Sequence, residues 1–178
     1  MPTSPTAPNT GSRPPEIWRG LFRSFGPAAT RHLGQAVGQR LCPGDVLLLK
    51  GGLGAGKTCF CQGLALGLGV PSTVRVTSPS FALLQQYQGR VPFWHADLYR
   101  LTDPGELVEL GLVDAARAVL AIEWANLFPS EMPPTHVWVE WQMGRGHYRR
   151  IVLTTTNRDL AARLGDLPVA CTPNRRKQ

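Results

Sequence analysis

The sequence has no long hydrophobic run, few charged residues and few cysteines, and each feature excludes a class of protein. No stretch approaches the roughly 18 consecutive apolar residues of a membrane-spanning helix, and residues 1–15 lack the apolar core of a secretion signal. Charged residues make up 17% and hydrophobic residues 43%, which excludes a coiled coil and a wholly disordered chain. The four cysteines form no Cys-x-x-Cys pair, so their spacing predicts reduced thiols and no zinc site. We therefore expect a cytoplasmic protein with no membrane partner.

The chain of 178 residues is long enough for one domain, flanked by two segments of different composition. Residues 1–15 are rich in Pro, Ser and Thr, which predicts a disordered leader. The folded domain is expected over 16–164, and 165–178 is expected to be a basic, flexible tail. Residues 145–178 contain eight Lys and Arg against two acids, so the basic charge is concentrated at this end. Such a block is typical either of phosphate contacts with a polyanion such as tRNA or of a solvated end.

Short apolar runs of strand length alternate with helical patterns. The apolar spacing and the capping signals predict helices over 27–41, 58–68, 103–110 and 158–164. Strand patterns occupy 46–49, 73–76, 81–88, 91–98, 119–122, 137–141 and 150–155. Strands interleaved with helices predict an α/β fold, in which a largely parallel sheet has added antiparallel strands and helices on both faces.

Residues 51–58 match the pattern G-x-x-x-x-G-K-[ST] of a nucleotide-binding phosphate loop. The loop follows a buried-type strand and enters a helix, so its backbone N–H groups and the helix N-terminus would face a phosphate. Lys57 is expected to reach the terminal phosphates, and the Thr58 hydroxyl is expected to hold Mg²⁺. The domain is therefore predicted to be a P-loop NTPase-like domain that binds a nucleoside triphosphate.

Magnesium also needs a carboxylate at the end of a neighbouring strand, and two acids qualify. Glu123 ends the run 119–122, and Asp97 ends the strand pattern that begins at Val91. Each acid could instead cap a strand or pair with an arginine. The segment 78–81 offers two hydroxyls that could sense a terminal phosphate, although composition alone favours an ordinary turn. Trp124 follows a candidate metal ligand and could line the site.

Four motifs in this order resemble a known family: 53–58 (LGAGKT), 78–81 (SPSF), 95–101 (HADLYRL) and 122–124 (IEW). Together they are similar to the bacterial tRNA threonylcarbamoyladenosine biosynthesis ATPase family TsaE, over about residues 30–153. The resemblance implies a small ATPase that uses ATP and Mg²⁺ and works with the TsaB and TsaD proteins. TsaD transfers the threonylcarbamoyl group to the adenosine next to the tRNA anticodon. It further implies that the chain supports repeated turnover and does not perform the transfer.

The resemblance also implies roles for single residues. Asp97 resembles the acidic residue needed for hydrolysis, Ser80 occupies the hydroxyl position of the switch-like segment, and both are expected to be catalytic together with Lys57. Thr58 with Glu123 resembles the magnesium pair. The residues expected to contact the nucleotide are Thr30, Gly54, Ala55, Gly56, Lys57, Thr58 and Arg149. Gly52 replaces the usual Asp, Cys59 and Ser80 replace Thr, and Ala125 replaces the usual Pro.

Two other functions remain open from the residues. One is a small P-loop kinase of a nucleoside or metabolite, in which Arg145, Arg149 and Arg150 clamp phosphates. The other is a nucleotide-gated binding module, in which a segment such as 78–81 is ordered by the nucleotide. Stimulation of hydrolysis by a partner would separate a gated module from a self-sufficient kinase.

Overall fold

A computed structural model describes residues 17–167, so the leader 1–15 and residues 168–178 of the tail lie outside the described residues. The strands are β1 (Trp18–Ser24), β2 (Val46–Lys50), β3 (Leu84–Tyr87), β4 (Phe93–Asp97), β5 (Val119–Glu123), β6 (Val137–Met143) and β7 (Arg149–Thr155). The α-helices are α1 (Pro27–Gly38), α2 (Lys57–Gly67), α3 (Gly105–Glu109) and α4 (Arg158–Leu164). Three short 3₁₀ helices are η1 (Leu112–Arg117), η2 (Ala125–Leu127) and η3 (Pro129–Glu131). No helix among these is long and apolar enough to cross a membrane.

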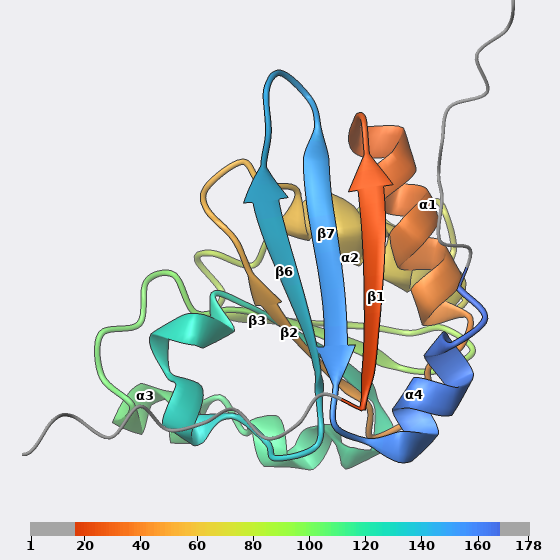
Figure 1. The fold of residues 1–178 in the computed structure, drawn as a ribbon. Helices are drawn as coiled ribbons and strands as arrows, with labels where there is room; N and C mark the ends of the chain where they lie inside the picture. Colours follow the sequence, from red (N-terminus) through yellow and green to blue (C-terminus); the bar gives the residue numbers. More distant parts are fainter. Residues whose placement is uncertain (1–16, 168–178) are drawn as a thin grey trace, which may run out of the picture.

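The seven strands form one sheet in the order β1-β7-β6-β2-β5-β4-β3 (Figure 1). The four central strands β6, β2, β5 and β4 run parallel to one another. On one side β7 pairs antiparallel with β6 and β1 pairs antiparallel with β7, and on the other side β3 pairs antiparallel with β4. The predicted α/β fold, with a parallel core and added antiparallel strands, is therefore confirmed.

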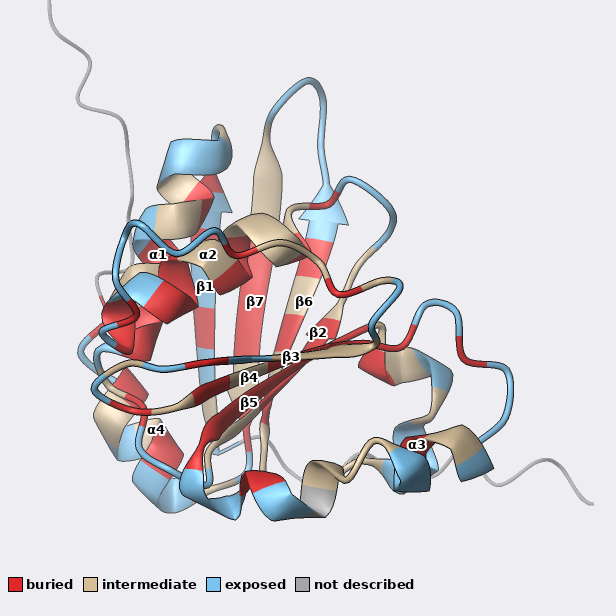
Figure 2. Ribbon diagram, turned by 180° about the vertical axis from the view of Figure 1, so that it is seen from behind, coloured by how far each residue is buried: buried red, intermediate tan, exposed pale blue. Residues whose placement is uncertain are grey.

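Each central strand contributes side chains to two hydrophobic cores, one on each face of the sheet. In β2, Leu47 and Leu49 belong to the core shared with α1, α2 and α4, and Leu48 belongs to the other core, which includes residues of α3 and the 3₁₀ helices. This alternation follows from the two-residue period of a strand. Because both faces are covered, β5 is buried along its whole length (Figure 2). A strand that is covered on both faces is marked in the sequence by an unbroken apolar run such as 119–122.

Most of the predicted helices and strands are present with shifted ends. One predicted strand is absent, and one observed strand was not predicted. The pattern at 73–76 is not a strand: this prediction was wrong. Val76 is buried, and its carbonyl accepts a hydrogen bond from Gln62 Nε2 of α2 (3.1 Å) instead of a strand partner. Strand β1 was not predicted, and it pairs with β7 over its full length. Its inward residues include Gly20 and Ser24, so no clear apolar alternation marks it in the sequence.

Candidate functional site

The phosphate loop and the ends of β4 and β5 surround a cavity of about 580 Å³ at the carboxyl edge of the parallel strands. Asp97 and Glu123 are opposite each other in the ladder between β4 and β5, and Glu123 lies beside Leu49 of β2. Parallel strands bring their carboxyl ends to one edge, and ligands of open α/β sheets bind there. The cavity lining includes the predicted residues Gly54, Ala55, Gly56, Lys57, Thr58, Ser80, Asp97 and Glu123.

The phosphate loop has the backbone conformation that its glycines allow. Gly54 and Gly56 have φ values of 71° and 112°, in the region that a residue with a Cβ rarely adopts. Gly56 is the N-cap of α2, and no side chain caps this helix end. The N–H groups at the start of α2 thus remain available to an anion in the cavity.

Lys57 is buried at the start of α2, and its ammonium is held over the loop. Its Nζ donates hydrogen bonds to the carbonyls of Gly51 (2.8 Å) and Gly52 (3.0 Å). The same nitrogen lies 3.9 Å from the centre of the Trp124 ring, a cation–π contact. Burial lowers the pKa of Lys57, while the neighbouring charges of Glu123 and Asp97 act in the opposite direction. The ammonium therefore faces the cavity from a partly desolvated position, where its interaction with an anion is strengthened.

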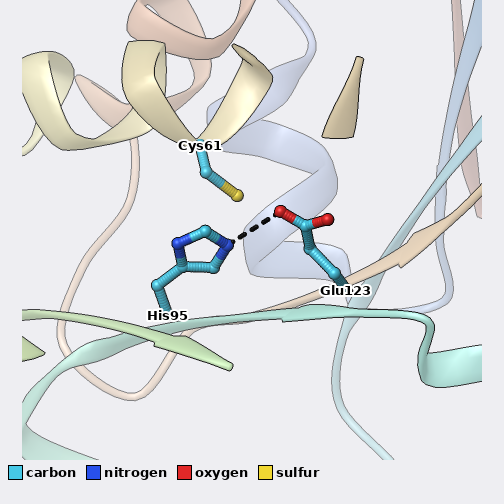
Figure 3. A group of neighbouring side chains, drawn as sticks. All are labelled: Cys61, His95 and Glu123. Carbon is cyan, nitrogen blue, oxygen red and sulfur yellow. Dashed lines mark hydrogen bonds and ion pairs between the residues drawn. The ribbon is translucent and has the colours of Figure 1, made fainter. Parts of the chain in front are cut away.

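Glu123 connects the phosphate loop to β4 through a single oxygen. Its Oε1 accepts hydrogen bonds from the Thr58 hydroxyl (2.9 Å) and from Nε2 of His95 (3.0 Å). Figure 3 shows the His95 ring and the Cys61 thiol on the same side of this carboxylate. Glu123 is only 3% exposed and His95 is fully buried, so the carboxylate is held firmly beside Thr58. A hydroxyl and a carboxylate in contact are oxygen donors of the kind that Mg²⁺ prefers.

Asp97 is held by the segment that follows α2 and by its own chain. Its Oδ2 accepts a hydrogen bond from the Ser78 hydroxyl, and its Oδ1 accepts one from the Tyr99 backbone N–H (3.0 Å). Ser78 is thus the hydroxyl partner of Asp97, and both Ser78 and the predicted site residue Ser80 line the cavity. The sequence pointed to the segment 78–81, but the hydroxyl that contacts the carboxylate is decided by the path of the chain.

Three further residues complete the cavity wall. Trp124 has φ 62°, which turns the chain directly after Glu123 and brings its ring over Lys57. The Tyr99 and Trp124 rings lie 4.9 Å apart, and Arg100 is stacked over the exposed Phe81 ring at 4.6 Å. Tyr99 and Arg100 belong to the motif 95–101, but neither is among the predicted site residues. Their positions directly after Asp97 in the sequence were the available signal.

Thr30 and Arg149 lie at a second, smaller cavity of about 200 Å³ on the other side of the phosphate loop. The two cavities share Pro27, Gly54, Ala55, Gly56 and Cys59 as lining residues. Thr30 is buried and its hydroxyl is within 2.7 Å of the Ser24 hydroxyl. Arg149 donates from Nη1 to the carbonyls of Gly146 and Tyr148 (both 2.9 Å). The predicted site residues therefore lie around one loop, with Thr30 and Arg149 at its far side.

The fold and the loop define the class, a P-loop α/β protein. Residues 26–151 match the family model described as "Threonylcarbamoyl adenosine biosynthesis protein TsaE". The chain therefore belongs to the TsaE family, as the motifs indicated.

Relatives and a solved structure agree with this assignment. A protein of Treponema pallidum (strain Nichols) is 42% identical over 58% of this chain and 77% of its own length. A protein of Nostoc sp. is 38% identical over 72% of this chain and 82% of its own length. Both are described as tRNA threonylcarbamoyladenosine biosynthesis protein TsaE. The crystal structure of Bacillus subtilis YdiB matches 84% of this chain and 94% of its own, with a TM-score of 0.72 and 29% identity.

Proposed function

We propose that the chain binds ATP with Mg²⁺ at the larger cavity and hydrolyses it in support of tRNA threonylcarbamoyladenosine formation. The observation that carries the proposal is the meeting of Lys57, the pair Thr58 and Glu123, and Asp97 around one glycine-rich loop. These residues come from three elements that are far apart in the sequence. They supply a cation, oxygen ligands and a second carboxylate, the set that phosphoryl transfer requires.

The terminal phosphates are expected to lie against the loop, with Lys57 as their main cationic contact. The ammonium would exchange the Gly51 and Gly52 carbonyls for phosphate oxygens, which bear full negative charge. Thr58 and Glu123 would hold Mg²⁺, which supplies neutralisation of the charge on the phosphates. His95 would keep Glu123 oriented, since it donates to the same carboxylate oxygen as Thr58 does.

Asp97 is the proposed positioning group for the attacking water. Both of its oxygens already accept hydrogen bonds, from Ser78 and from Tyr99, so the carboxylate is fixed at the cavity wall. An anionic carboxylate there can accept a hydrogen bond from water and orient it toward the terminal phosphate. Ser80 would contribute a hydroxyl to the same wall.

The smaller cavity is the proposed place for the nucleoside end of ATP. The support is that Thr30 and Arg149, the two residues expected to contact the nucleotide outside the phosphate loop, both line this cavity. The indole Nε1 of Trp141 is buried without a hydrogen-bond partner in the described part of the chain, and a Cβ on Gly56 would lie 3.7 Å from it. A polar group of the ligand in this region would satisfy that donor.

Family membership supports the proposed partners and setting. The chain would act with TsaB and TsaD in the cytoplasm, where its ATP hydrolysis resets the complex between rounds of threonylcarbamoyl transfer. Contact with tRNA would be indirect or through the basic residues of the tail.

The test is a comparison of the wild type with Lys57→Ala in three assays: binding of a non-hydrolysable ATP analogue, ATP hydrolysis, and modification of tRNA with TsaB and TsaD. Loss of the ammonium from a partly desolvated site should weaken binding and lower hydrolysis by at least about 100-fold. The variant should also fail to support repeated tRNA modification. Wild-type hydrolysis by Lys57→Ala would refute the phosphate-loop role. Formation of a phosphorylated nucleoside by the purified protein would favour the small kinase.

A further inference from the structure

We propose that Cys61, His95 and Glu123 form a binding site for a soft divalent cation of the Zn²⁺ type, and that an ion bound there inhibits the protein by occupying Glu123. The inhibitory part rests on the proposed ATPase function, while the binding part does not. The spacing of the cysteines in the sequence predicts no such site, because its three residues come from α2, β4 and β5.

The three side chains converge on one point. One donor atom from each residue, the Cys61 sulfur, a His95 ring nitrogen and a Glu123 oxygen, lies within 4.8 Å of the other two. In Figure 3 the thiol points down from α2 toward the space between the imidazole and the carboxylate. Donors around a tetrahedral zinc ion lie about 3.3–3.7 Å apart, given bond lengths of about 2.0–2.3 Å. Small side-chain rotations would therefore bring these donors to zinc distances.

The donor set discriminates between metals. Thiolate and imidazole ligands favour Zn²⁺, whereas Mg²⁺ is bound by oxygen atoms and by retained water. Three protein ligands leave a fourth position for a water molecule or for the nearby Thr58 hydroxyl. Glu123 lines the larger cavity and Cys61 does not, so an ion would enter from the cavity past Glu123.

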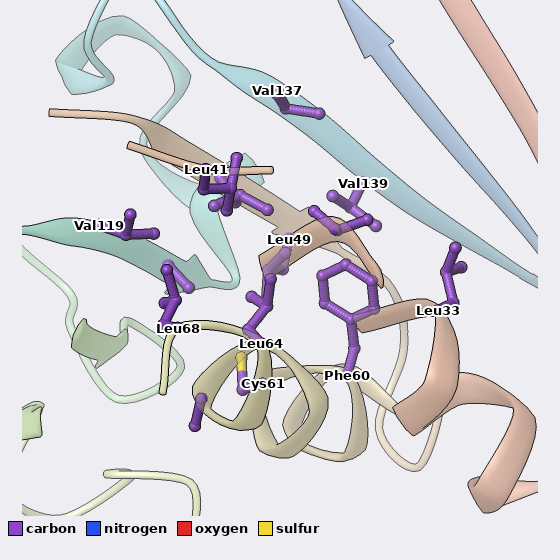
Figure 4. Packing of buried hydrophobic residues seen from close by; sticks show 14 of the residues in the cluster. Leu33, Leu41, Leu49, Phe60, Cys61, Leu64, Leu68, Val119, Val137 and Val139 are labelled. Carbon is purple, nitrogen blue, oxygen red and sulfur yellow. The ribbon is translucent and has the colours of Figure 1, made fainter. Parts of the chain in front are cut away.

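Among the described residues, the Cys61 thiol makes no hydrogen bond. It is fully buried on α2, in the hydrophobic cluster that contains Phe60 and Leu64 (Figure 4). A valine would fill this position with similar volume and would be a more apolar choice. The charges that act on the thiol include those of Glu123, Asp97 and Lys57, and Figure 3 shows the sulfur facing His95 and Glu123.

Binding of the cation releases one proton. Without metal, Nε2–H of His95 donates to Glu123 Oε1, and Nδ1 has no hydrogen-bond partner in the described structure. On binding, metal bonds form to the sulfur, to Nε2 and to the carboxylate, the S–H proton leaves to solvent, and the imidazole proton moves from Nε2 to Nδ1. No electron is transferred. The neutral imidazole and the thiolate are then both ligands.

The bound ion would remove Glu123 from its role beside the phosphate loop. The oxygen that accepts from Thr58 is the same oxygen that faces His95. Once this oxygen ligates a cation between Cys61 and His95, it is lost to the magnesium pair. Hydrolysis should then fall even when Mg²⁺ is in excess.

The first experiment measures binding without any nucleotide, on the full chain. Co²⁺ is added as a coloured substitute for Zn²⁺, and thiolate coordination is read from the sulfur-to-cobalt charge-transfer absorption. The wild type and Cys42→Ser, which removes an exposed cysteine, should both show the band. Cys61→Val should lack it, and its Zn²⁺ affinity should fall at least about 100-fold, since loss of even an outer-shell partner costs about 10- to 100-fold. Cys61→Ala is a second variant if valine disturbs the fold. No band in the wild type, or a band that persists in both Cys61 variants, overturns the proposal.

The second experiment measures inhibition. ATP itself chelates Zn²⁺, so the fall in hydrolysis on adding Zn²⁺ is compared between the wild type and Cys61→Val at equal Mg²⁺ and ATP. The zinc concentration for half inhibition should be at least about tenfold higher in the variant. Equal inhibition of the two proteins would overturn the inhibitory role, even if the cobalt band assigns the site. An inactive wild type would instead refute the ATPase proposal and leave the binding result standing.

Discussion

Two buried carboxylates share a single buried ammonium at the carboxyl edge of the sheet. Asp97 and Glu123 are each 3% exposed, and Lys57 is 5% exposed. Buried charges are tolerated when hydrogen bonds satisfy them, and each of these groups has at least two polar partners. The two carboxylates are nevertheless held by different partners, so we expect substitutions of Glu123 and of Asp97 to have different effects. Glu123 is tied to the phosphate loop, and Asp97 is tied to the segment after α2.

Asp97→Asn tests whether this second carboxylate acts on the reacting water. The amide keeps the shape but loses the charge and one acceptor, so kcat for ATP hydrolysis should fall by about 10²- to 10⁴-fold, the usual range for a positioned acid–base group. Binding of the ATP analogue should change little, because Lys57 and the loop remain. Ser78→Ala removes only the hydroxyl that donates to Asp97 and should have a smaller effect on kcat. Full activity of Asp97→Asn would return this residue to a structural role.

At the scale of elements, α1 and α2 pack with their backbones in contact. A Cβ built on Gly63 of α2 would lie 2.1 Å from the Arg31 carbonyl oxygen of α1. A Cβ on Gly34 of α1 would lie 2.3 Å from the Phe60 carbonyl oxygen of α2. Both distances are far below any real contact, so only glycine permits this approach. The pair of helices fixes the direction of α2, and with it the position of the phosphate loop.

Gly63→Ala should therefore destabilise the protein. Overpacking of this kind costs about 1–3 kcal/mol or more, because backbone atoms cannot rotate away. The measurement is the free energy of unfolding in urea. Gly26→Ala is the matched control, since no heavy atom lies within 4 Å of its added Cβ and its φ of 166° is extended backbone. Equal stability of Gly63→Ala and the wild type would contradict the close approach of the two helices.

A second link between elements joins α4 to the loop before β2. Arg163 makes a two-pronged ion pair with Asp45, with Nη1 to Oδ2 at 2.6 Å and Nη2 to Oδ1 at 2.8 Å. Its Nη1 also donates to the Arg40 carbonyl (2.8 Å). The ion pair with Asp45 raises the pKa of Arg163, so the guanidinium stays charged.

Arg163→Met should lower the free energy of unfolding by about 1–3 kcal/mol, the range for hydrogen bonds between charged groups. The loss is at the low end if solvent replaces the pair, since the Arg163 side chain is 30% exposed. Arg163→Lys keeps the charge but not the planar fork, and should recover only part of the stability. A urea titration at neutral pH measures all three proteins. Full recovery by lysine would show that charge alone matters here.

At the scale of the whole molecule, the two cavities are lined by residues from many parts of the fold. Their linings come from the start of α1, the loop after β2, the ends of β4 and β5, and the hairpin between β6 and β7. A nucleotide that fills both would hold these parts together. Binding to the folded state alone then raises the stability of the entire domain.

Addition of Mg²⁺ and a non-hydrolysable ATP analogue at 100 times its Kd should stabilise the protein by about 2.7 kcal/mol. For a domain of this size, that corresponds to a rise in Tm of about 5–10 °C. Thermal unfolding followed by circular dichroism measures the shift. Lys57→Ala at the same ligand concentration should show a much smaller rise. A shift of equal size in both proteins would place binding away from the phosphate loop.

Local patterns in the sequence were enough to predict the central elements and the loop. The runs 46–49 and 119–122 are apolar at every position, because strands covered on both faces need apolar side chains in both directions. The motif 51–58 is contiguous, so its chemistry can be recognised without knowledge of the fold. The end of each predicted parallel strand also marks the edge of the sheet where ligands bind, so Asp97 and Glu123 could be predicted as cavity residues from the ends of their strands.

Pairing between distant segments could not be predicted in this way. Strand β1 is identified only by its backbone pairing with β7. The apolar pattern at 73–76 forms no strand, and the Val76 carbonyl accepts a hydrogen bond from the Gln62 side chain instead. The contact between Ser78 and Asp97 and the convergence of Cys61 on His95 and Glu123 likewise join residues from different elements. Spacing along a chain reports side-chain periodicity within one element, whereas these contacts depend on how the elements pack. The paths of α2, β4 and β5 therefore decide which side chains meet in the site.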